Sequence, residues 1–383
     1  MQISATDVLI VGAGPAGLTA AVVLTQRGHQ VTVVDAQAEG ANTSRAAVVH
    51  PHTLELLEPY GVTEDLVRRG VHTPTFAIRD RDALLLAVPF DKLPTRYPYT
   101  LMISQAETEA FLLARLEQLG GKVLRPAVVS AVRQDEDGAE VSFTDGHRVH
   151  ARYVIGADGM HSTVREEAGI AFTGGTYDES FTLADVRLSG GVPKNEVILY
   201  FSPAGLVVVA PLPDGKYRIV ATVDEAPQAP DVAFVQHLLD ERGPQAHAAV
   251  VDEVVWGSRF RVHHRVAETF RMGRVLLVGD AGHVHSPAGG QGMNLGIEDA
   301  VLLGECLSGV LAGGPDSALD DYATNRHRTA ERVVALASRL TELATASPRR
   351  RPIRNVVMRL AGKIPAVRNQ LATRLSGLDR RNG

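Results

Sequence analysis

A glycine-rich turn between an apolar strand and a helix is the feature that most constrains the fold of this chain. Residues 7–11 (DVLIV) have the apolar pattern of a buried strand, and residues 12–17 (GAGPAG) lead into an apolar helical run. A second apolar run, residues 31–34, ends at Asp35, 18 positions after Gly17. This order predicts a βαβ unit whose glycines let the backbone approach a pyrophosphate and whose acid binds a ribose hydroxyl. We therefore expect the chain to bind a dinucleotide.

A second motif lies late in the chain, at residues 274–300 (RVLLVGDAGHVHSPAGGQGMNLGIEDA). An apolar run ends at Gly279-Asp280, a loop rich in glycine and proline follows, and a helical pattern begins at about Met293. The carboxylate of Asp280 can accept hydrogen bonds from a sugar-like chain, and the bare glycine backbone lets a planar ring approach. The helix N-terminus offers unpaired N–H groups and partial positive charge. These parts suit a reduced flavin, which carries negative charge at one edge.

A third motif is the segment 152–165, in which a strand ends before Gly156-Ala157-Asp158-Gly159 and a short helix follows. Ser162 is a suitable residue to cap that helix. Taken alone, this segment predicts only a strand–turn–helix junction.

Composition limits the class of protein. The 383 residues, 45% hydrophobic and 22% charged, suffice for two globular cores. The net charge of -5 does not favour nucleic acid as a partner. No run is long enough to cross a bilayer, and the first apolar run is a strand rather than a signal peptide, so we expect a cytoplasmic protein. With Cys306 as the only cysteine, an intrachain disulfide and the dithiol flavoenzymes are excluded.

The strand and helix patterns predict an α/β fold in several parts. From Phe181 to about Val262, strand-like runs separated by turn signals predict a mostly antiparallel sheet, which Thr75–Val88 is expected to join. We expect a dinucleotide-binding domain at 1–73, 97–172 and 273–345, and a substrate domain at 74–96 and 173–272. Residues 346–383 are expected to form C-terminal basic amphipathic helices.

That C-terminal segment contains ten Lys and Arg residues after Pro348 and one acid, Asp379. Its apolar residues recur every three or four positions: Ile353, Val356, Leu360, Ile364, Val367, Leu371 and Leu375. The spacing predicts an amphipathic helix, broken near Pro365, that packs on the body by its apolar face. A membrane-surface or acidic-partner role is the alternative.

The order and spacing of GAGPAG, GADGMHSTVR and GDAGHVHSPAGGQGMN resemble those of the FAD-dependent aromatic hydroxylases. These are class A flavoprotein monooxygenases, of which para-hydroxybenzoate hydroxylase is a well-known member. Three further segments resemble the branch that hydroxylates aromatic polyketides: SRAAVVHPHTLELL at 44–57, RVHHRVAETFRMGRV at 261–275 and LSGLDRR at 375–381. Many members of that branch continue into a thioredoxin-like domain, which we expect to be absent here. The resemblance implies a Rossmann-like FAD-binding domain of the glutathione reductase type, with an inserted, mostly antiparallel substrate sheet and C-terminal helices.

The resemblance also implies which residues contact a non-covalently bound FAD. The residues implied to hold the pyrophosphate are Gly12, Gly14, Pro15, Ala16 and Gly17. Asp35, where the family more often has Glu, is implied to bind the adenine ribose, Val129 the adenine through its backbone, and Gln105 the phosphate–ribityl region. Arg45 is implied to contact the cofactor near the flavin, and Asp280 to bind the ribityl chain. Asp158 and Arg165 fit a motif associated with both FAD and the pyridine nucleotide. The residues implied to surround the isoalloxazine are Pro287, Gly289, Gly290, Gln291, Gly292, Met293 and Asn294.

The reaction implied by the resemblance uses NAD(P)H to reduce FAD. Oxygen then adds to the reduced flavin as a C4a-hydroperoxide, which transfers one oxygen atom to an aromatic ring. No second GxGxxG follows the first, so NAD(P)H is expected to dock transiently, and the sequence does not distinguish NADH from NADPH.

No general base is assigned, and Arg45 and Pro287 are the only candidates for a catalytic role. Tyr200, Tyr217, His263 or His264 could deprotonate a phenol, but each is better explained as a sheet or surface residue. A metal site at His283 and His285 is not expected, because the glycine loop and helix account for that segment.

Two other functions remain open at this point. One is an FAD-dependent reductase or dehydrogenase of the same superfamily without oxygen transfer. The other is a non-catalytic flavoprotein that traps an intermediate. A flavin-dependent halogenase would be expected to contain a WxWxIP segment, and this chain has Trp256 alone. The substrate, the position oxidised and the oligomeric state, monomer or homodimer, cannot be deduced from the sequence.

Overall fold

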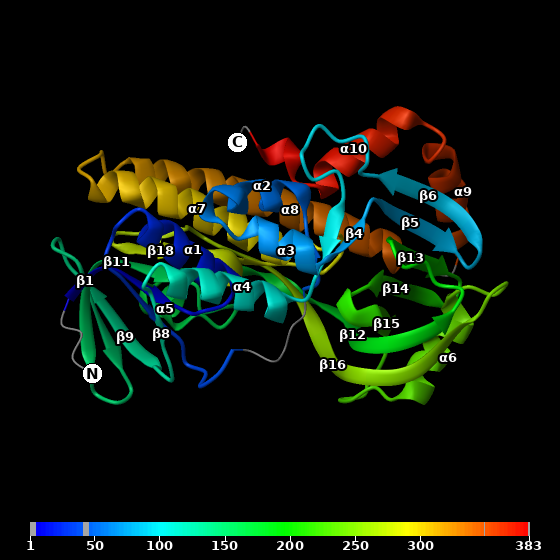
Figure 1. The fold of residues 1–383 in the computed structure, drawn as a ribbon, viewed down its shortest axis with the longest axis horizontal. Coiled ribbons are helices and arrows are strands. Elements are labelled where there is room, and N and C mark those ends of the chain that lie inside the picture. The colour runs from blue at the N-terminus through cyan, green and yellow to red at the C-terminus, as the bar shows by residue number, and fades with distance from the viewer. Residues whose placement is uncertain (1–4, 41–45, 348, 382–383) are drawn as a thin grey trace.

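The computed structural model describes residues 5–40, 46–347 and 349–381. Arg45, one of the implied cofactor contacts, lies outside the described residues. Two eight-stranded sheets stand at opposite ends of the molecule, and the long helices α7 (Gly292–Leu311) and α8 (Ala318–Ala344) run along one side (Figure 1). This mixture of a parallel and an antiparallel sheet with helices confirms the predicted α/β fold.

The first sheet is built on the predicted βαβ unit. Its strand order is β17-β18-β11-β1-β2-β8, parallel except at β17, and the β9–β10 hairpin joins it antiparallel through β11. The strands are β1 (Ala5–Val11), β2 (Val31–Val34), β8 (Val123–Leu124), β9 (Val129–Gln134), β10 (Ala139–Phe143), β11 (Arg148–Gly156), β17 (Arg271–Met272) and β18 (Val275–Leu277).

Strand β1 is apolar on both faces because it lies at the centre of this sheet. Val8 and Ile10 pack into a core shared with helices α1 (Pro15–Gln26), α4 (Gln105–Gln118) and α7. Leu9 and Val11 pack on the other face, against the β9–β10 hairpin and the short helix α5 (Thr163–Glu167). The continuous apolar run that predicted a buried strand is thus explained by burial from both sides.

The second sheet has the order β19-β16-β12-β15-β14-β13-β5-β6 and is antiparallel except between β13 and β5. Its strands are β5 (Thr75–Asp80), β6 (Ala83–Pro89), β12 (Phe172–Gly190), β13 (Glu196–Ser202), β14 (Gly205–Pro211), β15 (Lys216–Val223), β16 (Ala249–Ala267) and β19 (His283–Val284). Helix α6 (Val232–Arg242) packs on its core through Val235, Leu238 and Leu239. The predicted contribution of Thr75–Val88 to this sheet is confirmed.

Strands β12 and β16 are much longer than the runs Phe181–Leu188 and Val254–Val262 that their sequences predict. They pair from Phe172 opposite Ala267 to Gly190 opposite Ala249 and extend towards the first sheet (Figure 1). Gly174, a residue that usually indicates a turn, lies inside β12 with φ of 145°, and a Cβ there would lie 1.9 Å from the His264 carbonyl oxygen. A close backbone approach, invisible in the sequence, therefore accounts for this glycine.

Smaller elements connect the two sheets. A three-stranded sheet has the order β3-β7-β4, formed by β3 (Val48–Val49), β7 (Thr100–Met102) and β4 (Val71–Thr73). The remaining short elements are α2 (Pro51–Leu57), η1 (Glu58–Tyr60), α3 (Thr63–Arg69), η2 (Pro213–Gly215), η3 (Gly279–Ala281) and η4 (Leu378–Arg380). No helix in the described ranges is both long enough and apolar enough to cross a membrane.

The C-terminal helices α9 (Arg351–Ala361) and α10 (Pro365–Leu375) confirm the break expected near Pro365. Helix α10 packs its apolar face as predicted, because Ala372 and Leu375 are buried in the core around β6. For α9 the same prediction is wrong: Ile353 is 68% exposed, and Arg354 is buried in its place. Backbone carbonyl groups at the end of α8 and on β13 accept hydrogen bonds from that guanidinium, which outweighs the apolar pattern.

Candidate functional site

Close contacts with neighbouring backbone atoms require glycine at two positions of the first turn. Gly12 has φ of 104°, and a Cβ there would lie 2.2 Å from the Ala157 carbonyl oxygen. A Cβ at Gly17 would lie 1.9 Å from the Gly12 carbonyl oxygen. The helix can therefore start this close to the strand only if both residues are glycine. Gly14 is different, because a Cβ there would meet no atom within 4 Å. The open side of the turn is therefore at Gly14, beside the N-terminus of α1.

Asp35 lies at the same edge of the first sheet, at the end of β2. One carboxylate oxygen accepts a hydrogen bond from the Ala13 N–H at 2.7 Å, and the other accepts one from the Gln37 N–H at 2.8 Å. The Asp35 carbonyl oxygen accepts from the Ala127 N–H at 2.8 Å, which brings the start of β9, and with it Val129, to this edge. The glycine turn, the acid and Val129 are thus close together.

The middle motif forms the predicted strand–turn–helix junction. Ser162 caps α5 by accepting from the Arg165 N–H at 2.9 Å, and its hydroxyl donates to Asp158. Asp158 also accepts from the Val164 N–H at 3.1 Å, and burial raises the pKa of its carboxyl group. The side chain of Asp158 therefore holds its own turn in shape.

Arg165 links the middle motif to the late one. Its guanidinium is buried and donates to the Ala281 carbonyl oxygen at 3.0 Å and to the Met160 carbonyl oxygen at 3.0 Å. It also lies over the ring of Phe172, 4.0 Å from its centre. Arg165 thus supports the turn that carries Asp280.

The late motif crosses from one sheet to the other. Strand β18 belongs to the first sheet and β19 to the second, so the turn η3 and Asp280 lie at the junction of the two. Gly279 has φ of 61°, and a Cβ there would lie 3.0 Å from the Ala16 side chain. The three motifs therefore meet at one place: Gly12 against Ala157, Ala16 against Gly279, and Arg165 against Ala281. Asp280 is exposed there.

The loop before α7 is held by two buried amide side chains. Asn294 accepts from the His50 N–H at 2.7 Å and donates to the carbonyl oxygens of Val48 and Gly290. Gln291 donates to the Leu375 carbonyl oxygen at 3.0 Å, at the end of α10. The hydrogen-bonding groups of both side chains are thus occupied by other parts of the protein. A ring bound at these positions would therefore contact backbone groups rather than these side chains.

The other residues of this loop are placed as follows. Gly289 and Gly290 both have positive φ, 81° and 64°, and Gly290 lies against Val48. Gly292 and half-buried Met293 open α7, and Pro287 begins the turn that Gly290 closes with a hydrogen bond. Glycine adopts positive φ without a steric penalty, and its lack of a side chain leaves the backbone at the start of α7 bare, which suits a close approach by a planar ring.

A buried ionic network beneath this loop was not found from the sequence. Asp299 accepts from the Gly279 N–H at 3.2 Å, from His283 at 2.7 Å and from Arg326 at 2.6 Å. Glu298 forms two hydrogen bonds with Arg380, at 2.6 and 2.9 Å. Burial alone would raise the pKa of Asp299, but Arg326 and His283 outweigh it and lower that pKa. The network ties the Gly279 turn to α8 and to η4, which a helical pattern such as GIEDA does not indicate.

A second unexpected ion pair lies within the second sheet. Arg218 on β15 makes two hydrogen bonds with Asp185 on β12, at 2.8 and 2.9 Å, and donates to the Ala46 carbonyl oxygen at 2.9 Å. The Gln105 N–H donates to the same carbonyl oxygen at 3.0 Å. The residue after Arg45 is therefore held by the second sheet and by the start of α4, and Gln105 lies beside it.

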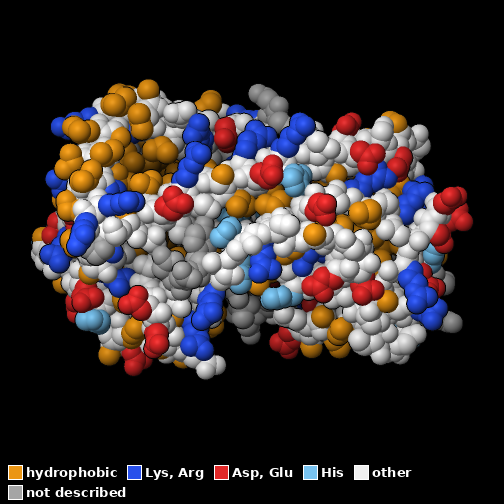
Figure 2. Space-filling model, turned by 180° about the vertical axis from the view of Figure 1, so that it is seen from behind, with side chains coloured by type: hydrophobic (Ala, Val, Ile, Leu, Met, Phe, Trp, Pro, Cys, Tyr) orange, Lys and Arg blue, Asp and Glu red, His pale blue; other side chains and the backbone are white. Residues whose placement is uncertain are grey.

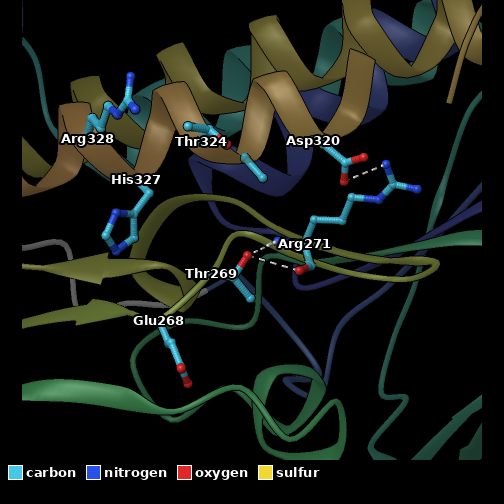
Figure 3. Close-up of a pocket in the computed structure, with 8 residues that line it drawn as sticks. Glu268, Thr269, Arg271, Asp320, Thr324, His327 and Arg328 are labelled. Atoms are coloured by element: carbon cyan, nitrogen blue, oxygen red, sulfur yellow. Dashed lines mark hydrogen bonds and ion pairs between the residues drawn. The ribbon is translucent and has the colours of Figure 1, made fainter. Parts of the chain in front are cut away.

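Two cavities differ in their relation to the motifs. One, of about 290 Å³, is bordered by residues of the middle motif and the second sheet: Met160, His161, Arg165, Glu166, Ile170, Phe172, His263 and Arg265. The other, of about 270 Å³, lies between α8 and the segment after β16 (Figure 3). It contains none of the predicted site residues, and its Arg271 is paired with Asp320 at 3.0 Å.

The four candidates for a general base are placed in the second sheet. Tyr200 and Tyr217 are buried in its core, and burial raises the pKa of Tyr200 to about 12. A phenol with so high a pKa is a poor acceptor for a proton at neutral pH. His263 lies on β16 at the 290 Å³ cavity and pairs with Thr176 at 2.8 Å.

The comparisons with known proteins agree with this geometry. The FAD binding domain family matches residues 5–337. A 12-dehydrotetracycline 5-monooxygenase/anhydrotetracycline 6-monooxygenase of Streptomyces rimosus subsp. rimosus is 36% identical over 391 residues, covering 97% of this chain and 76% of the relative. The crystal structure of a p-nitrophenol 4-monooxygenase from Pseudomonas putida DLL-E4 superposes with a TM-score of 0.86 at 27% identity, covering 100% of both chains. A dialkyldecalin synthase of Streptomyces rugosporus is 32% identical, covering 97% of this chain and 80% of the relative.

Proposed function

This chain belongs to the FAD binding domain family, and we propose that it is an FAD-dependent monooxygenase that hydroxylates an aromatic small molecule with NAD(P)H and O2. The substrate class is a phenol or a polyketide-like aromatic compound, as in the names of the relatives. Since NAD(P)H is an intracellular reductant, the proposal places the enzyme in the cytoplasm.

The observation that carries the proposal is the meeting of three distant motifs at one place. Their residues fit FAD: the open N-terminus of α1 at Gly14 suits the pyrophosphate, and Asp35 keeps acceptor capacity for a ribose hydroxyl. Asp280, exposed where the sheets join, suits the ribityl chain, and the start of α7 suits the electron-rich edge of the ring. The chemistry that bound FAD would supply here is the acceptance of a hydride from NAD(P)H and the transfer of electrons to oxygen.

We propose that the first sheet and its helices, at 1–73, 97–172 and 273–345, form the cofactor domain. The second sheet then forms the substrate domain, from 74–96 and 173–272. Its apolar strands would keep water away from the reacting ring, which favours oxygen transfer over loss of reducing equivalents. Because Arg218 holds the Ala46 carbonyl oxygen from this side, a substrate that moves β15 would also move the segment next to Arg45.

We further propose that NAD(P)H docks transiently at the 290 Å³ cavity beside the middle motif. Arg265 gives the cavity a guanidinium group, and His161 and His263 add two imidazoles. The guanidinium of Arg165 also borders the cavity but is held by backbone carbonyl oxygens, and Glu166 adds one carboxylate. Such a lining suits the phosphates of a dinucleotide. Asp158 lies next to this cavity and would support the loop rather than bind the ligand directly, since its oxygens hold Ser162 and Val164.

One alternative is favoured by a specific finding. The similarity to a dialkyldecalin synthase favours a synthase reaction as a second candidate function for this chain. A reductase without oxygen transfer is the other alternative. The three functions differ in what they consume and in the atoms they add to the product.

The test is turnover of the FAD-loaded protein with a panel of phenols and polyketide-like aromatics under 18O2. The proposal expects a yellow protein, NAD(P)H oxidation that an aromatic substrate accelerates at least tenfold, and one 18O atom in the product. NAD(P)H consumption with an 18O-free product would indicate a reductase. Product formed without NAD(P)H would indicate a synthase-like reaction.

A further inference from the structure

Helix α9 exposes an apolar ridge to solvent. Ile353, Val356, Val357 and Leu360 are 68%, 55%, 58% and 59% exposed, and Ile364, just beyond the helix, is 50% exposed. The spacing i, i+3, i+4, i+7 places the four helical residues on one face. Figure 2 shows this apolar patch at the upper left, with basic side chains beside it. Five aliphatic residues this exposed on one side are unusual for a surface that meets only water.

The orientation of α9 is set by its other face. Arg354 donates to the carbonyl oxygens of Leu343 at 2.9 Å and Phe201 at 3.0 Å and lies over the Phe201 ring. Asn355 donates to Asp80 at 2.8 Å, and Met358 packs beside Phe201 and Leu85. Turning the helix to bury its apolar ridge would leave these polar groups unpaired, so the ridge stays outward.

The charged residues of the segment that carries the ridge have one sign. Residues 349–375 contain eight Lys and Arg residues and no Asp or Glu, although the whole chain has a net charge of -5. Arg349, Arg350, Arg359 and Lys363 are all exposed. The ridge is therefore bordered by cations that have no acidic neighbour within the segment.

This charge argues against a second copy of the chain as the occupant. In a two-fold dimer the same patch meets itself, so each cation would face like charges across the interface. A surface with closely spaced negative head groups over an apolar layer complements both the cations and the aliphatic side chains. We propose that α9, together with Ile364, is an interfacial anchor that binds the surface of an anionic lipid membrane.

In this arrangement α9 lies in the plane of the membrane with Ile353, Val356, Val357 and Leu360 among the acyl chains. The basic residues contact the lipid phosphates. The binding is peripheral and reversible, since a single short helix inserts only as far as the boundary between the head groups and the acyl chains. It is independent of the proposed oxygenase reaction, because none of the predicted site residues lies on α9.

The test is co-sedimentation of the full-length, FAD-loaded protein with large unilamellar vesicles. We expect vesicles of phosphatidylcholine with 30% phosphatidylglycerol to bind the protein at least tenfold more tightly than phosphatidylcholine alone. Raising NaCl from 0.05 to 0.5 M should reduce the binding, because salt screens the cations. The double variant I353S/L360S and the double variant R359E/K363E should each lose at least tenfold in affinity.

The matched control is V250S/V255S, which removes two aliphatic residues of similar exposure, 50% and 46%, from β16. It should bind vesicles as the wild type does. FAD content and NAD(P)H oxidation should be the same in I353S/L360S and the wild type, so a failed oxygenase assay would not affect this result. Equal binding by I353S/L360S and the wild type would overturn the proposal. So would a wild-type dimer in light scattering that I353S/L360S converts to a monomer.

Discussion

The glycine turn at residues 12–17 and the loop at residues 286–294 each open a helix at the candidate site, but they are held in different ways. The first depends on backbone contacts made almost entirely within the turn and with Ala157. The second is held by its own amide side chains, which bond to backbone groups of His50 and Leu375 in distant segments, and by the Asp299 network. The conformation of a motif can thus be predicted from its own residues when steric contacts within it define that conformation. The conformation of a loop that depends on contacts with distant segments cannot be predicted in this way.

The largest effect is expected from a matched pair of alanine substitutions in the first turn. Gly12→Ala places a Cβ 2.2 Å from the Ala157 carbonyl oxygen at a φ of 104°. It should cost at least about 5 kcal/mol of unfolding free energy and abolish FAD binding. Gly14→Ala meets no atom within 4 Å, so its stability should stay within about 0.5 kcal/mol of wild type.

Thermal unfolding of the FAD-free protein and fluorescence titration with FAD measure the two properties separately. Because a methyl group at Gly14 would occupy the space proposed for the pyrophosphate, the FAD affinity of the Gly14→Ala variant should be at least tenfold lower than that of the wild type. Unchanged FAD affinity in Gly14→Ala would contradict the proposed place of the pyrophosphate.

The next effect tests the outside support of the late loop. Asp299→Asn removes a buried charge that pairs with Arg326 and His283 and leaves the Arg326 guanidinium less compensated. Breaking such a buried pair should cost about 3–5 kcal/mol. Denaturant unfolding measures the loss, and FAD affinity should fall with it because Asp299 also holds the Gly279 N–H.

The control for Asp299→Asn is Glu305→Gln on the same helix, where a half-exposed carboxylate pairs with Arg27 at 3.0 Å. An exposed pair of this kind is worth less than about 1 kcal/mol. If the two variants lost equal stability, the network would not be the main support of the loop.

The smallest effect concerns pH. Burial lowers the pKa of His285, in the late loop, to about 4, whereas an unfolded chain has a histidine pKa of about 6.5. The folded protein therefore binds fewer protons between these values, so its stability is complete above pH 6.5 and falls as the pH drops towards 4. Each such histidine should account for about 3 kcal/mol over this window.

His285→Asn should flatten the pH dependence of the unfolding free energy by that amount. Denaturant unfolding at pH 4.5, 5.5 and 7 gives the slopes. A slope in His285→Asn as steep as that of the wild type would show that other groups control the acid response. His50, whose pKa burial also lowers to about 4, is then the next residue to replace.

The prediction of the fold from the sequence succeeded where local patterns have one physical meaning. Strand, glycine turn, helix and acid appear in order at residues 7–35, and the insertion of a mostly antiparallel sheet was recognised from its turns. It failed at β12 and β16, whose length comes from pairing with each other, and at α9, whose apolar spacing did not reveal which face is docked.

The site was predicted to the same degree. Its glycines and acids could be assigned to three motifs, but the roles of Gln291 and Asn294 inside the protein became visible only with their partners in place. Glu298, Asp299, Arg326 and Arg380 carried no signal, since isolated charges in a helical pattern are usually exposed. Their structural role depends on burial and on partners up to 82 positions away in the sequence.

The sequence by itself determined the βαβ unit, the three motifs and the class of cofactor, because backbone sterics at glycine and the position of an acid after a strand act over a few residues. Only the tertiary structure decided that the motifs meet at one junction between the sheets, that a buried ionic network supports it, and that α9 faces outward. These features depend on contacts between distant residues, whose free energy is set by burial and by partners that the local pattern does not specify.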